Sequence, residues 1–235
     1  MVSVCMATYN GERFVREQLE SVLSQLTPDD EVIVADDMST DATLDVVRKF
    51  SDSRIRILPG EEHLGPIYNL ERALLASRGE YVFLSDQDDV WLAGKVSECL
   101  LGLRDADLIL HDAYFYGQLP DGSWARGKTV FELRPPRHGV LKNWFRNCFT
   151  GCCMAFRRSL FSRAIPFPKR LPMHDQWLGL VAEKTGRVRF IDKPLVDYRR
   201  HSGNATDLLN GSGASLAKRF KWRFDLLRIL FRFSK

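Results

Sequence analysis

The run YVFLSDQDD at residues 81–89 decides the fold of this chain, because a short apolar segment ends there directly in carboxylates. Its apolar and aromatic residues are typical of a buried β-strand. The same arrangement occurs twice before it: VSVCMA at 2–7 runs into the polar turn TYNG, and EVIVA at 31–35 runs into an Asp-Asp pair. We therefore predict three buried strands whose carboxyl ends carry polar side chains.

Helical segments separate these strands. Helices are predicted over 15–26, 42–50 and 67–77, and a further strand over 54–58. Such an alternation favours parallel strands joined by crossover helices, so the polar strand ends share one edge of the sheet, outside which ligands of open α/β sheets bind. The acidic residues expected to converge there are Asp36, Asp37, Asp86 and Asp88.

The second half of the chain has a weaker pattern. Strands are predicted over 108–115, 152–156, 188–191 and 195–198, and a helix over 175–184. Residues 117–139 form a stretch rich in Gly, Pro and Arg without a predicted element, and strand directions cannot be predicted here. A hydrophobic share of 45% excludes a disordered or collagen-like chain, and we expect one compact unit at 1–210 with a tail at 211–235.

Cysteine usage favours reduced, buried thiols over disulfides or a zinc site, because the number is odd and no CxxC spacing occurs. The first residues lack the basic start and apolar stretch of a secretory signal, and no run is long enough to span a membrane. We therefore expect a protein of the cytoplasm. The five cysteines are Cys5, Cys99, Cys148, Cys152 and Cys153.

Asp86 and Asp88 are candidates for a metal site. Carboxylates crowded at a strand end repel one another unless a positive charge lies between them. A hard cation such as Mg²⁺ or Mn²⁺ takes such oxygen ligands and keeps positions for water or phosphate. The alternative is a polar turn or a cap for the next helix. Trp91, a large aromatic residue close behind the carboxylates, favours a lined pocket.

Five stretches taken together resemble glycosyltransferase family 2. They occur in the family's order and span residues 2 to about 205, nearly the whole chain. Each is weak alone, whereas five in register are a strong signal. The stretches are ATYNG at 7–11, ADDMSTD at 35–41, SDQDDVW at 85–91, HD at 174–175 and YRRHSGN at 198–204.

The resemblance implies the GT-A fold, a Rossmann-like, mostly parallel central sheet flanked by helices, here with a C-terminal amphipathic helix. It implies inverting transfer of a sugar from a nucleotide-diphosphate donor, dTDP-rhamnose or a UDP-sugar. The acceptor is expected to be a hydroxyl of a glycan or of a lipid-linked molecule in surface polysaccharide biosynthesis. The SDQDDVW form resembles a subgroup rich in rhamnosyltransferases.

The resemblance also implies roles for single residues. Asp175 matches the general base, and Asp86, Asp88 and His201 match the residues that hold Mg²⁺ or Mn²⁺ and the diphosphate. Met38 stands where the family usually has a glycine, which leaves the geometry of that turn open. The residues implied in nucleotide-sugar binding are Thr8, Asn10, Glu12, Asp36, Asp37, Asp86, Gln87 and Trp91.

These residue types suit the chemistry independently of the resemblance. A cation beside a departing diphosphate neutralises developing charge, and a carboxylate in reach of the acceptor hydroxyl removes its proton. Plainer interpretations stay open: Asp175 at a helix start meets the macrodipole, and His201 is a surface residue beside two arginines. His111 and Asp112 face the acceptor or satisfy each other.

Other functions explain less of the sequence. A nucleotidyltransferase acting on sugar phosphates is the main alternative, but it usually has a Gly-rich, basic loop after the first strand, which residues 8–13 do not supply. A phosphate-accepting receiver domain leaves Asp175 and His201 unexplained. A dinucleotide-binding domain requires a GxGxxG run after an opening strand, and none is present.

The tail at 215–235 is predicted to be a basic amphipathic helix. It carries seven Lys or Arg and one Asp, a net of +6, so with +4 for the chain, residues 1–214 carry −2. Its apolar face either lies in a membrane interface, with the cations on anionic lipid, or packs on the protein while the basic side chains reach water. No nucleic-acid partner is expected.

Liposome flotation distinguishes these two interpretations of the tail. The chain with and without residues 215–235 is mixed with vesicles that contain anionic lipid. The membrane interpretation expects the intact chain to float and the shortened chain to lose most of that binding, because the cations and the apolar face are removed together. Equal flotation of both forms excludes it.

Overall fold

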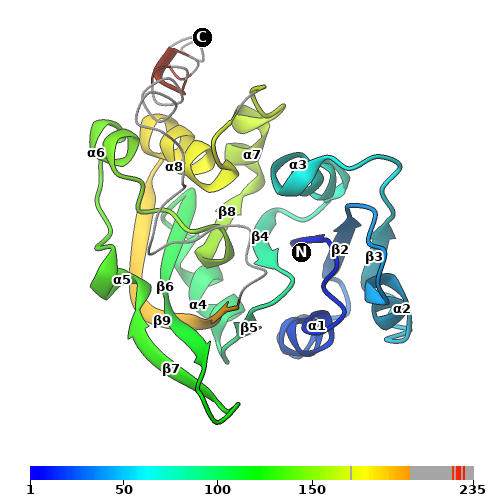
Figure 1. Cartoon of the computed structure of the whole chain (residues 1–235). Helices are drawn as coiled ribbons and strands as arrows, with labels where there is room; N and C mark the ends of the chain where they lie inside the picture. Colours follow the sequence, from blue (N-terminus) through cyan, green and yellow to red (C-terminus); the bar gives the residue numbers. More distant parts are fainter. Residues whose placement is uncertain (170, 202–223, 225, 229, 231–235) are drawn as a thin grey trace.

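The computed structural model describes residues 1–169, 171–201, 224, 226–228 and 230, which form a mixed sheet flanked by helices (Figure 1). The strands are β1 (Val2–Thr8), β2 (Glu31–Asp36), β3 (Ile55–Leu58), β4 (Tyr81–Asp86), β5 (Val90–Trp91), β6 (Leu108–Gln118), β7 (Trp124–Thr129), β8 (Met154–Arg157) and β9 (Val188–Arg200). The helices are α1 (Val15–Leu23), α2 (Thr43–Arg48), α3 (Gly65–Ala76), α4 (Lys95–Gly102), α5 (Val130–Leu133), α6 (Val140–Phe145), α7 (Arg158–Ala164) and α8 (His174–Thr185), with a 3₁₀ turn η1 (Gly151–Cys153).

The first half of the sheet is parallel, as the alternation of strands and helices predicted. β1 lies between β2 and β4, and β3 pairs with β2, all in parallel. The strand ends are level: Thr8 is in register with Asp36, and Ala7 with Asp86. The predicted convergence of polar strand ends at one edge is therefore confirmed for these three strands.

The second half is mixed in direction. β8 runs antiparallel to β4 and β6, whereas β9 is parallel to β6, and β5 pairs with β9 in the opposite direction. The two strands predicted at 188–191 and 195–198 are one strand, β9. Its register shifts where Pro194 lies opposite Asp112, an irregularity that accommodates a residue without an N–H donor.

Residues 117–139 are not a plain connection. They contain the end of β6, the antiparallel partner strand β7 and the short helix α5. The Thr129 side chain and Glu132 form a reciprocal capping box at the start of α5. The Gly and Arg content concealed the hairpin because β7 has no buried residue and so lacks an apolar alternation.

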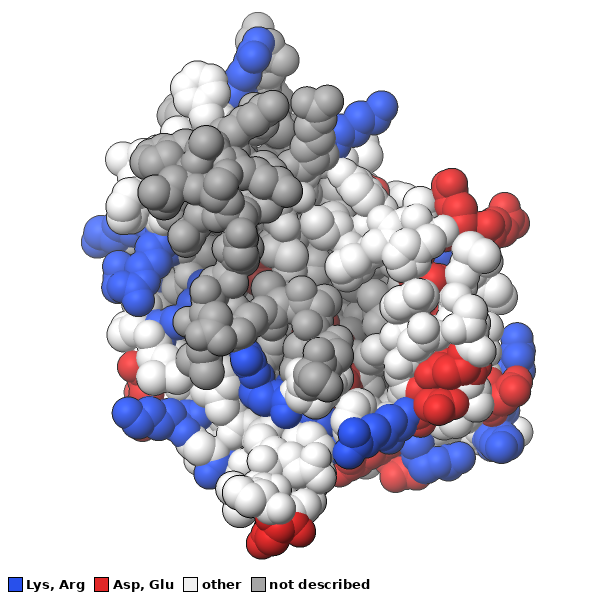
Figure 2. Space-filling view, in the orientation of Figure 1, with Lys and Arg blue, Asp and Glu red and all other residues white. Residues whose placement is uncertain are grey.

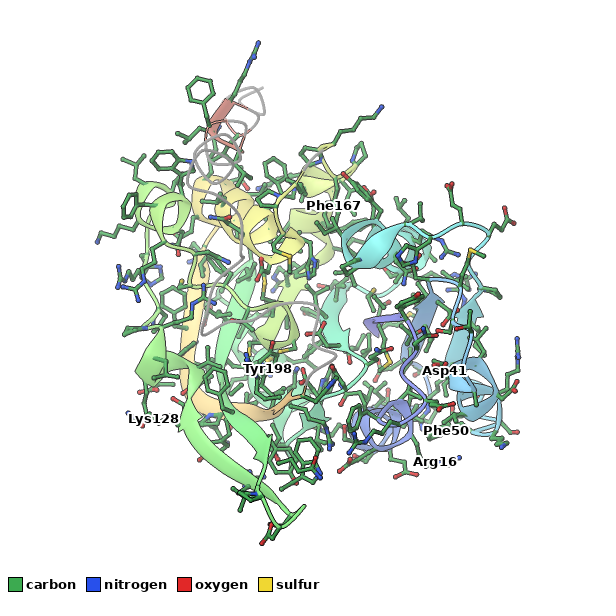
Figure 3. All side chains as sticks on the ribbon, viewed as in Figure 1. Arg16, Asp41, Phe50, Lys128, Phe167 and Tyr198 are labelled. Carbon is green, nitrogen blue, oxygen red and sulfur yellow. The ribbon has the colours of Figure 1, made fainter. Side chains whose placement is uncertain are left out.

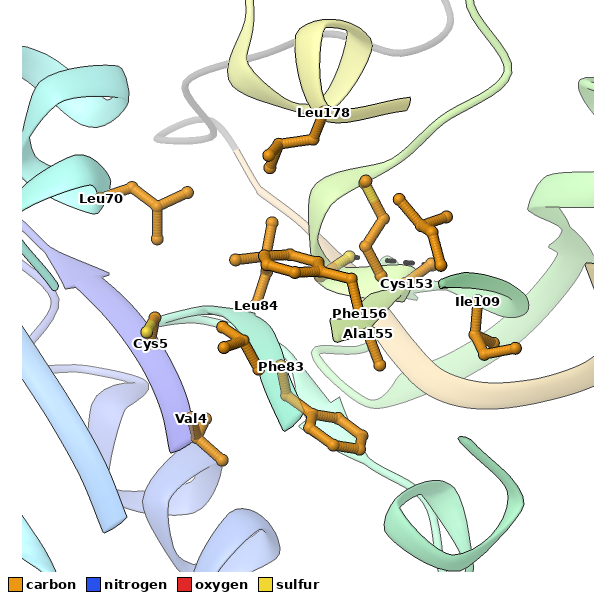
Figure 4. Packing of buried hydrophobic residues seen from close by; sticks show 14 of the residues in the cluster. Val4, Cys5, Leu70, Phe83, Leu84, Ile109, Cys153, Ala155, Phe156 and Leu178 are labelled. Carbon is orange, nitrogen blue, oxygen red and sulfur yellow. Dashed lines mark hydrogen bonds between the residues drawn. The ribbon is translucent and has the colours of Figure 1, made fainter. Parts of the chain in front are cut away.

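The core lies between the sheet and the helices on it. Around β4, Leu84 lies on the face of the sheet toward Phe156 of β8 and Leu178 of α8, whereas Phe83 points to the opposite face, and all four are almost fully buried (Figure 4). The five cysteines are buried and free, so the predicted reduced thiols are confirmed. These apolar contacts fix β4 and β8 side by side and thereby position the loop that follows β4.

Only part of the predicted tail helix falls among the described residues, and the boundary at 210/211 lies outside them. Leu226 and Leu230 are buried, and the Leu230 carbonyl accepts a hydrogen bond from Lys184 of α8. Phe224 is exposed.

Among the residues described, no helix combines the length and hydropathy needed to cross a bilayer. On the face in Figure 2, most exposed Asp and Glu lie toward α2 and α3.

Helix α8 depends on a glycine in its buried face. A Cβ at Gly179 would lie 2.1 Å from the Phe149 ring, so Gly179→Ala should lower the free energy of unfolding by about 1–3 kcal/mol through overpacking. This outcome opposes the usual gain from replacing a helical glycine by alanine. Gly117→Ala, where no atom lies within 4 Å, is the matched control. Chemical denaturation measures both, and an unchanged midpoint for Gly179→Ala contradicts the packing argument.

Candidate functional site

Asp36 holds the turn after β2. It is 1% exposed, and its carboxylate accepts hydrogen bonds from the Thr8 hydroxyl at 2.9 Å and from the backbone N–H and hydroxyl of Ser39 at 2.8 and 2.6 Å. Met38, within this turn, has a φ of 64°, a left-handed conformation that glycine adopts most easily. The turn therefore keeps a glycine-like backbone although the expected glycine is absent.

Asp37 caps helix α3. Its two carboxylate oxygens accept hydrogen bonds from the backbone N–H groups of Leu64 at 2.7 Å and Gly65 at 2.8 Å, and His63 Nδ1 lies 3.0 Å from it. A carboxylate at a helix start satisfies free N–H groups and meets the positive end of the dipole. Asp37 thus caps a helix, which is the plainer interpretation of an acidic residue at a strand end.

Three other residues predicted to bind the nucleotide sugar join neighbouring loops. The side chains of Asn10 and Glu12 each accept a hydrogen bond from a backbone N–H of the 40–42 segment at 2.8 Å. The amide group of Gln87 donates to the Tyr9 carbonyl and accepts from the Tyr9 N–H, both at 2.9 Å. The loops after β1, β2 and β4 are thus held together at the carboxyl edge of the sheet.

A cluster of acidic side chains follows β4. Asp86 ends the strand, and Asp88 and Asp89 follow it at 9% and 0% exposure. Burial raises the pKa of Asp86, and the charges of Asp88 and Asp175 raise it further. Burial also holds the pKa of Asp89 well above its usual range, with Asp88 and Asp86 adding to the effect. The protein concentrates more negative charge here than its own groups neutralise.

His201 contacts this cluster directly. Its Nε2 lies 2.8 Å from Asp88 Oδ2, and its ring packs against Phe14 with centroids 4.7 Å apart. The structure therefore brings together two of the residues predicted as metal ligands, one from the β4 loop and one from the end of β9. A histidine 113 residues away in sequence reaches Asp88 only because β9 returns to this edge of the sheet.

Arg199 fastens the end of β9 to the acidic loop. Its Nε donates to the Asp88 carbonyl at 2.7 Å, and its backbone N–H donates to Asp89 Oδ1 at 2.9 Å. The guanidinium lies over the rings of Phe14 and Trp124, 4.7 and 4.6 Å from their centroids. These contacts position His201, two residues further on, toward Asp88.

Tyr198, labelled in Figure 3, lies on β9 beside the same group of charges. Burial raises the pKa of its hydroxyl far above the usual value, and the nearby Cys152 and the three acidic residues of the β4 loop add to this. The phenol therefore stays neutral around neutral pH.

The residues present fit a hard divalent cation. Ligand atoms of Asp86, Asp89 and Cys152 all lie within 4.8 Å of one another. Asp89 Oδ2 is buried, and none of the described residues gives it a hydrogen bond. The two carboxylates supply the oxygen ligands that Mg²⁺ and Mn²⁺ prefer, whereas a thiol is a poor ligand for either. Asp88, paired with His201, lies in the same loop and extends the set.

Asp175 occupies the first turn of α8, next to this cluster. It is 7% exposed, and its Oδ1 accepts a hydrogen bond from the Gln176 N–H. Burial raises its pKa to about 6, while the Gln176 N–H, Arg134 and Asn147 lower it. Its charge in turn raises the pKa of Asp86, so the first turn of α8 lies near enough to the end of β4 for the two carboxylates to interact electrostatically.

Some residues that were considered as contacts for the donor or the acceptor are buried and bonded within the protein. Trp91 is 3% exposed and belongs to the core, where its ring packs on Phe83 and under Lys95, so it offers no free face for a sugar to stack on. His111 is fully buried, with its Nδ1 2.7 Å from the Asp112 carbonyl oxygen. The Asp112 carboxylate accepts from backbone N–H groups at the start of α5 and within β6.

Three residues of the site were not predicted as such: Asp89, Cys152 and Lys95. Asp89 had a signal in the sequence, since it continues the acidic run after β4. Cys152 reaches the cluster through the antiparallel pairing of β8 with β4, whose direction the sequence left open. Lys95 is an isolated basic residue in an otherwise mixed segment, and only its burial marks it.

The raised pKa of Asp175 predicts a pH-dependent stability. In the unfolded chain this carboxyl titrates near 3.8 and in the folded protein near 6. Its stabilising contribution is therefore complete below pH 3.8 and is lost as the pH rises through about 6, a difference of roughly 3 kcal/mol. Asp175→Asn, which cannot ionise and still accepts from the Gln176 N–H, should exceed the wild type in melting temperature at pH 7.5.

That difference should shrink as the pH falls toward 4. Thermal unfolding of both proteins in EDTA across this range is the measurement, and comparing them at each pH cancels the contribution of other titrating groups such as His174. A melting-temperature difference that is the same at pH 4 and pH 7.5 contradicts the assignment of a raised pKa to Asp175.

Comparison with known proteins finds relatives that match most of the chain. The chain is 28% identical to the dTDP-rhamnosyl transferase RfbG of Shigella flexneri, over 95% of this chain and 79% of that protein. It is 30% identical to the UDP-Glc:alpha-D-GlcNAc-diphosphoundecaprenol beta-1,3-glucosyltransferase WfgD of Escherichia coli, over 82% and 73%.

Solved structures share the fold. TarS of S. aureus in complex with UDP-GlcNAc superposes with a TM-score of 0.68 at 23% identity, covering 99% of this chain and 73% of that one. A mannosyltransferase of Pyrobaculum calidifontis in complex with GDP-Man and Mn²⁺ gives 0.61 at 23% identity, over 84% and 55%. The expected GT-A architecture is thus confirmed, as a mixed sheet. Because the model of the family "Glycosyl transferase family 2" matches residues 3–164, the chain belongs to glycosyltransferase family 2.

Proposed function

We propose that this glycosyltransferase is metal-dependent and inverting, and that it transfers a sugar from a dTDP- or UDP-linked donor to a hydroxyl of a glycan or lipid-linked acceptor. The observation that carries the proposal is that Asp86, at the end of β4, and Asp175, at the start of α8, are close enough for the charge of one to raise the pKa of the other. Asp86 belongs to the crowded carboxylates that follow β4. Asp175 is a single carboxylate whose pKa is raised to about 6.

Asp175 is the proposed general base. A base whose pKa lies near neutral pH is ionised when it must accept a proton and basic enough to take it. In the proposed step the acceptor O–H proton moves to Asp175, and the acceptor oxygen forms a bond to the anomeric carbon. The C–O bond to the diphosphate breaks at the same time, and its electron pair leaves with the phosphate oxygen. Attack from the face opposite the leaving group inverts the anomeric centre.

Asp86, Asp88 and Asp89 are the proposed metal and diphosphate side of the site, with His201 beside Asp88. A divalent cation held there would neutralise the negative charge of the departing diphosphate. Arg199 fixes the loop and the end of β9 relative to each other through the Asp88 carbonyl and Asp89. The chain's own contribution is to hold these groups in place before the donor arrives.

The donor's nucleoside is assigned to the loops after β1 and β2. Thr8, Asn10, Glu12, Asp36 and Asp37 hold those loops in one shape through hydrogen bonds. In this proposal the loops meet the base and ribose with backbone groups and loop surfaces, because the carboxylates of Asp36 and Asp37 are engaged within the protein. The nature of the base, thymine or uracil, rests on the relatives named above.

The acceptor and the place of action follow from the same relatives. One of them carries a lipid-diphosphate acceptor in its name, which supports a lipid-linked acceptor in surface polysaccharide biosynthesis for this chain. Transfer to such an acceptor is proposed to take place at the cytoplasmic face of the inner membrane.

Calorimetry and a transfer assay test the proposal. UDP-, dTDP- and GDP-sugars are titrated with and without Mn²⁺, and the donor that binds is used for transfer to a lipid-diphosphate sugar. Asp86→Ala with Asp88→Ala should abolish the Mn²⁺-dependent part of donor binding. Asp175→Asn should retain donor binding and lose about 10²- to 10⁴-fold in turnover. Proton NMR of the product reads the anomeric configuration.

Asp45→Ala, on the exposed side of α2 with an ion pair to Arg48, is the control for loss of a carboxylate and should leave binding and turnover unchanged. Turnover that persists in Asp175→Asn removes the proposed base. Donor binding that is the same with and without Mn²⁺ in the wild type contradicts metal dependence, and a product with retained configuration contradicts inversion.

A further inference from the structure

Lys95 is a lysine with no exposed surface. It is 0% exposed and ranks among the largest fully buried side chains of the described residues. It begins helix α4, directly after Gly94, whose φ of 87° turns the chain into the helix. Its ammonium points inward, so it contacts neither solvent nor a bound substrate.

Three physical costs oppose a lysine at this position. A buried ammonium loses its hydration, and burial lowers the pKa of Lys95 accordingly. A positive charge in the first turn of a helix meets the positive end of the dipole. A long, flexible side chain also loses rotamer entropy on burial. An apolar residue of the same length would avoid the loss of hydration and the repulsion by the helix dipole, and would lose only part of the rotamer entropy.

The contacts of Lys95 are incomplete for a buried charge. Within the described part of the chain, Nζ donates one hydrogen bond, to the Cys152 carbonyl at 2.7 Å, and forms no ion pair with a carboxylate. The remaining contact is the Trp91 ring, whose centroid lies 4.0 Å from Nζ. This explains why Trp91 is buried: its ring stabilises an ammonium from behind the acidic loop.

The charge of Lys95 acts on the acidic cluster. Cys152, whose carbonyl it contacts, places its sulfur within 4.8 Å of ligand atoms of Asp86 and Asp89. The charge of Lys95 opposes the rise in the pKa of Asp86, and Asp89 in turn favours the charged lysine. The ammonium thus lies near enough to interact with the carboxylates electrostatically, while its hydrogen bond goes to the Cys152 carbonyl.

We propose that Lys95 is a built-in counter-charge for the metal site, a positioning residue that limits how tightly the acidic cluster binds a divalent cation. The inference rests on the proposed metal dependence. Without a fixed positive charge behind it, the cluster attracts a cation more strongly, because the repulsion between Lys95 and the cation is absent. With it, the carboxylates share one site at moderate affinity, so the cation can leave with the product diphosphate.

Mn²⁺ titration of charge variants tests the inference. Lys95→Gln keeps a donor for the Cys152 carbonyl and removes the charge, and Lys95→Met removes both. Each should lower the Mn²⁺ dissociation constant by about tenfold or more, measured by calorimetry without donor. Lys95→Arg keeps the charge and should stay within about threefold of the wild type. Lys193→Met, at an exposed ion pair with Glu98, is the control for loss of a lysine.

Thermal unfolding gives a second readout that a merely structural lysine would not change. The rise in melting temperature between EDTA and Mn²⁺ should be larger for Lys95→Gln than for the wild type, whatever the metal-free values are. An equal rise, with an unchanged dissociation constant, overturns the counter-charge role while leaving the proposed function intact. If the wild type does not bind Mn²⁺, both the counter-charge role of Lys95 and the proposed metal dependence are overturned. The titration of the wild type alone shows whether this is so.

Discussion

Repulsion between carboxylates at one edge of a parallel sheet is the constraint on which this structure depends. Parallel pairing of β1, β2 and β4 brings their carboxyl ends level, so acidic residues far apart in sequence share one small region. Each carboxylate must then be hydrogen-bonded, paired with a cation or left with a raised pKa. The structure uses all three solutions, at different strand ends.

How each carboxylate is stabilised distinguishes the residues that order the structure from those that are proposed to take part in the chemistry. Asp36 and Asp37 are satisfied by hydroxyl and backbone N–H groups, and they order the turn and the helix that follow. Asp89 accepts one backbone N–H on Oδ1, but its Oδ2 receives no hydrogen bond from the described residues, and the pKa values of Asp86 and Asp89 are both raised. The unsatisfied group is the one next to Asp175, which is why the candidate site lies at the end of β4 and not at the end of β2.

The second half of the chain completes the site by long-range contacts. β9 returns parallel to β6 and ends beside the acidic loop, where Arg199 and His201 contact it. Helix α8 presents Asp175 from another direction, and its close packing on Phe149 requires Gly179. The chemistry is therefore assembled from elements whose positions are set by packing over more than 100 residues.

The sequence by itself determined the alternating strands and helices up to residue 86 and the level strand ends, and it marked Asp86, Asp88, Asp175 and His201 as candidate site residues, because local periodicity and motif order carry that information. It did not determine the directions of β8 and β9, the engagement of Asp36 and Asp37 within the protein, or the burial of Trp91 beneath Lys95. Those were decided by tertiary structure, since whether a side chain is satisfied, paired or left charged depends on neighbours that only the folded chain supplies.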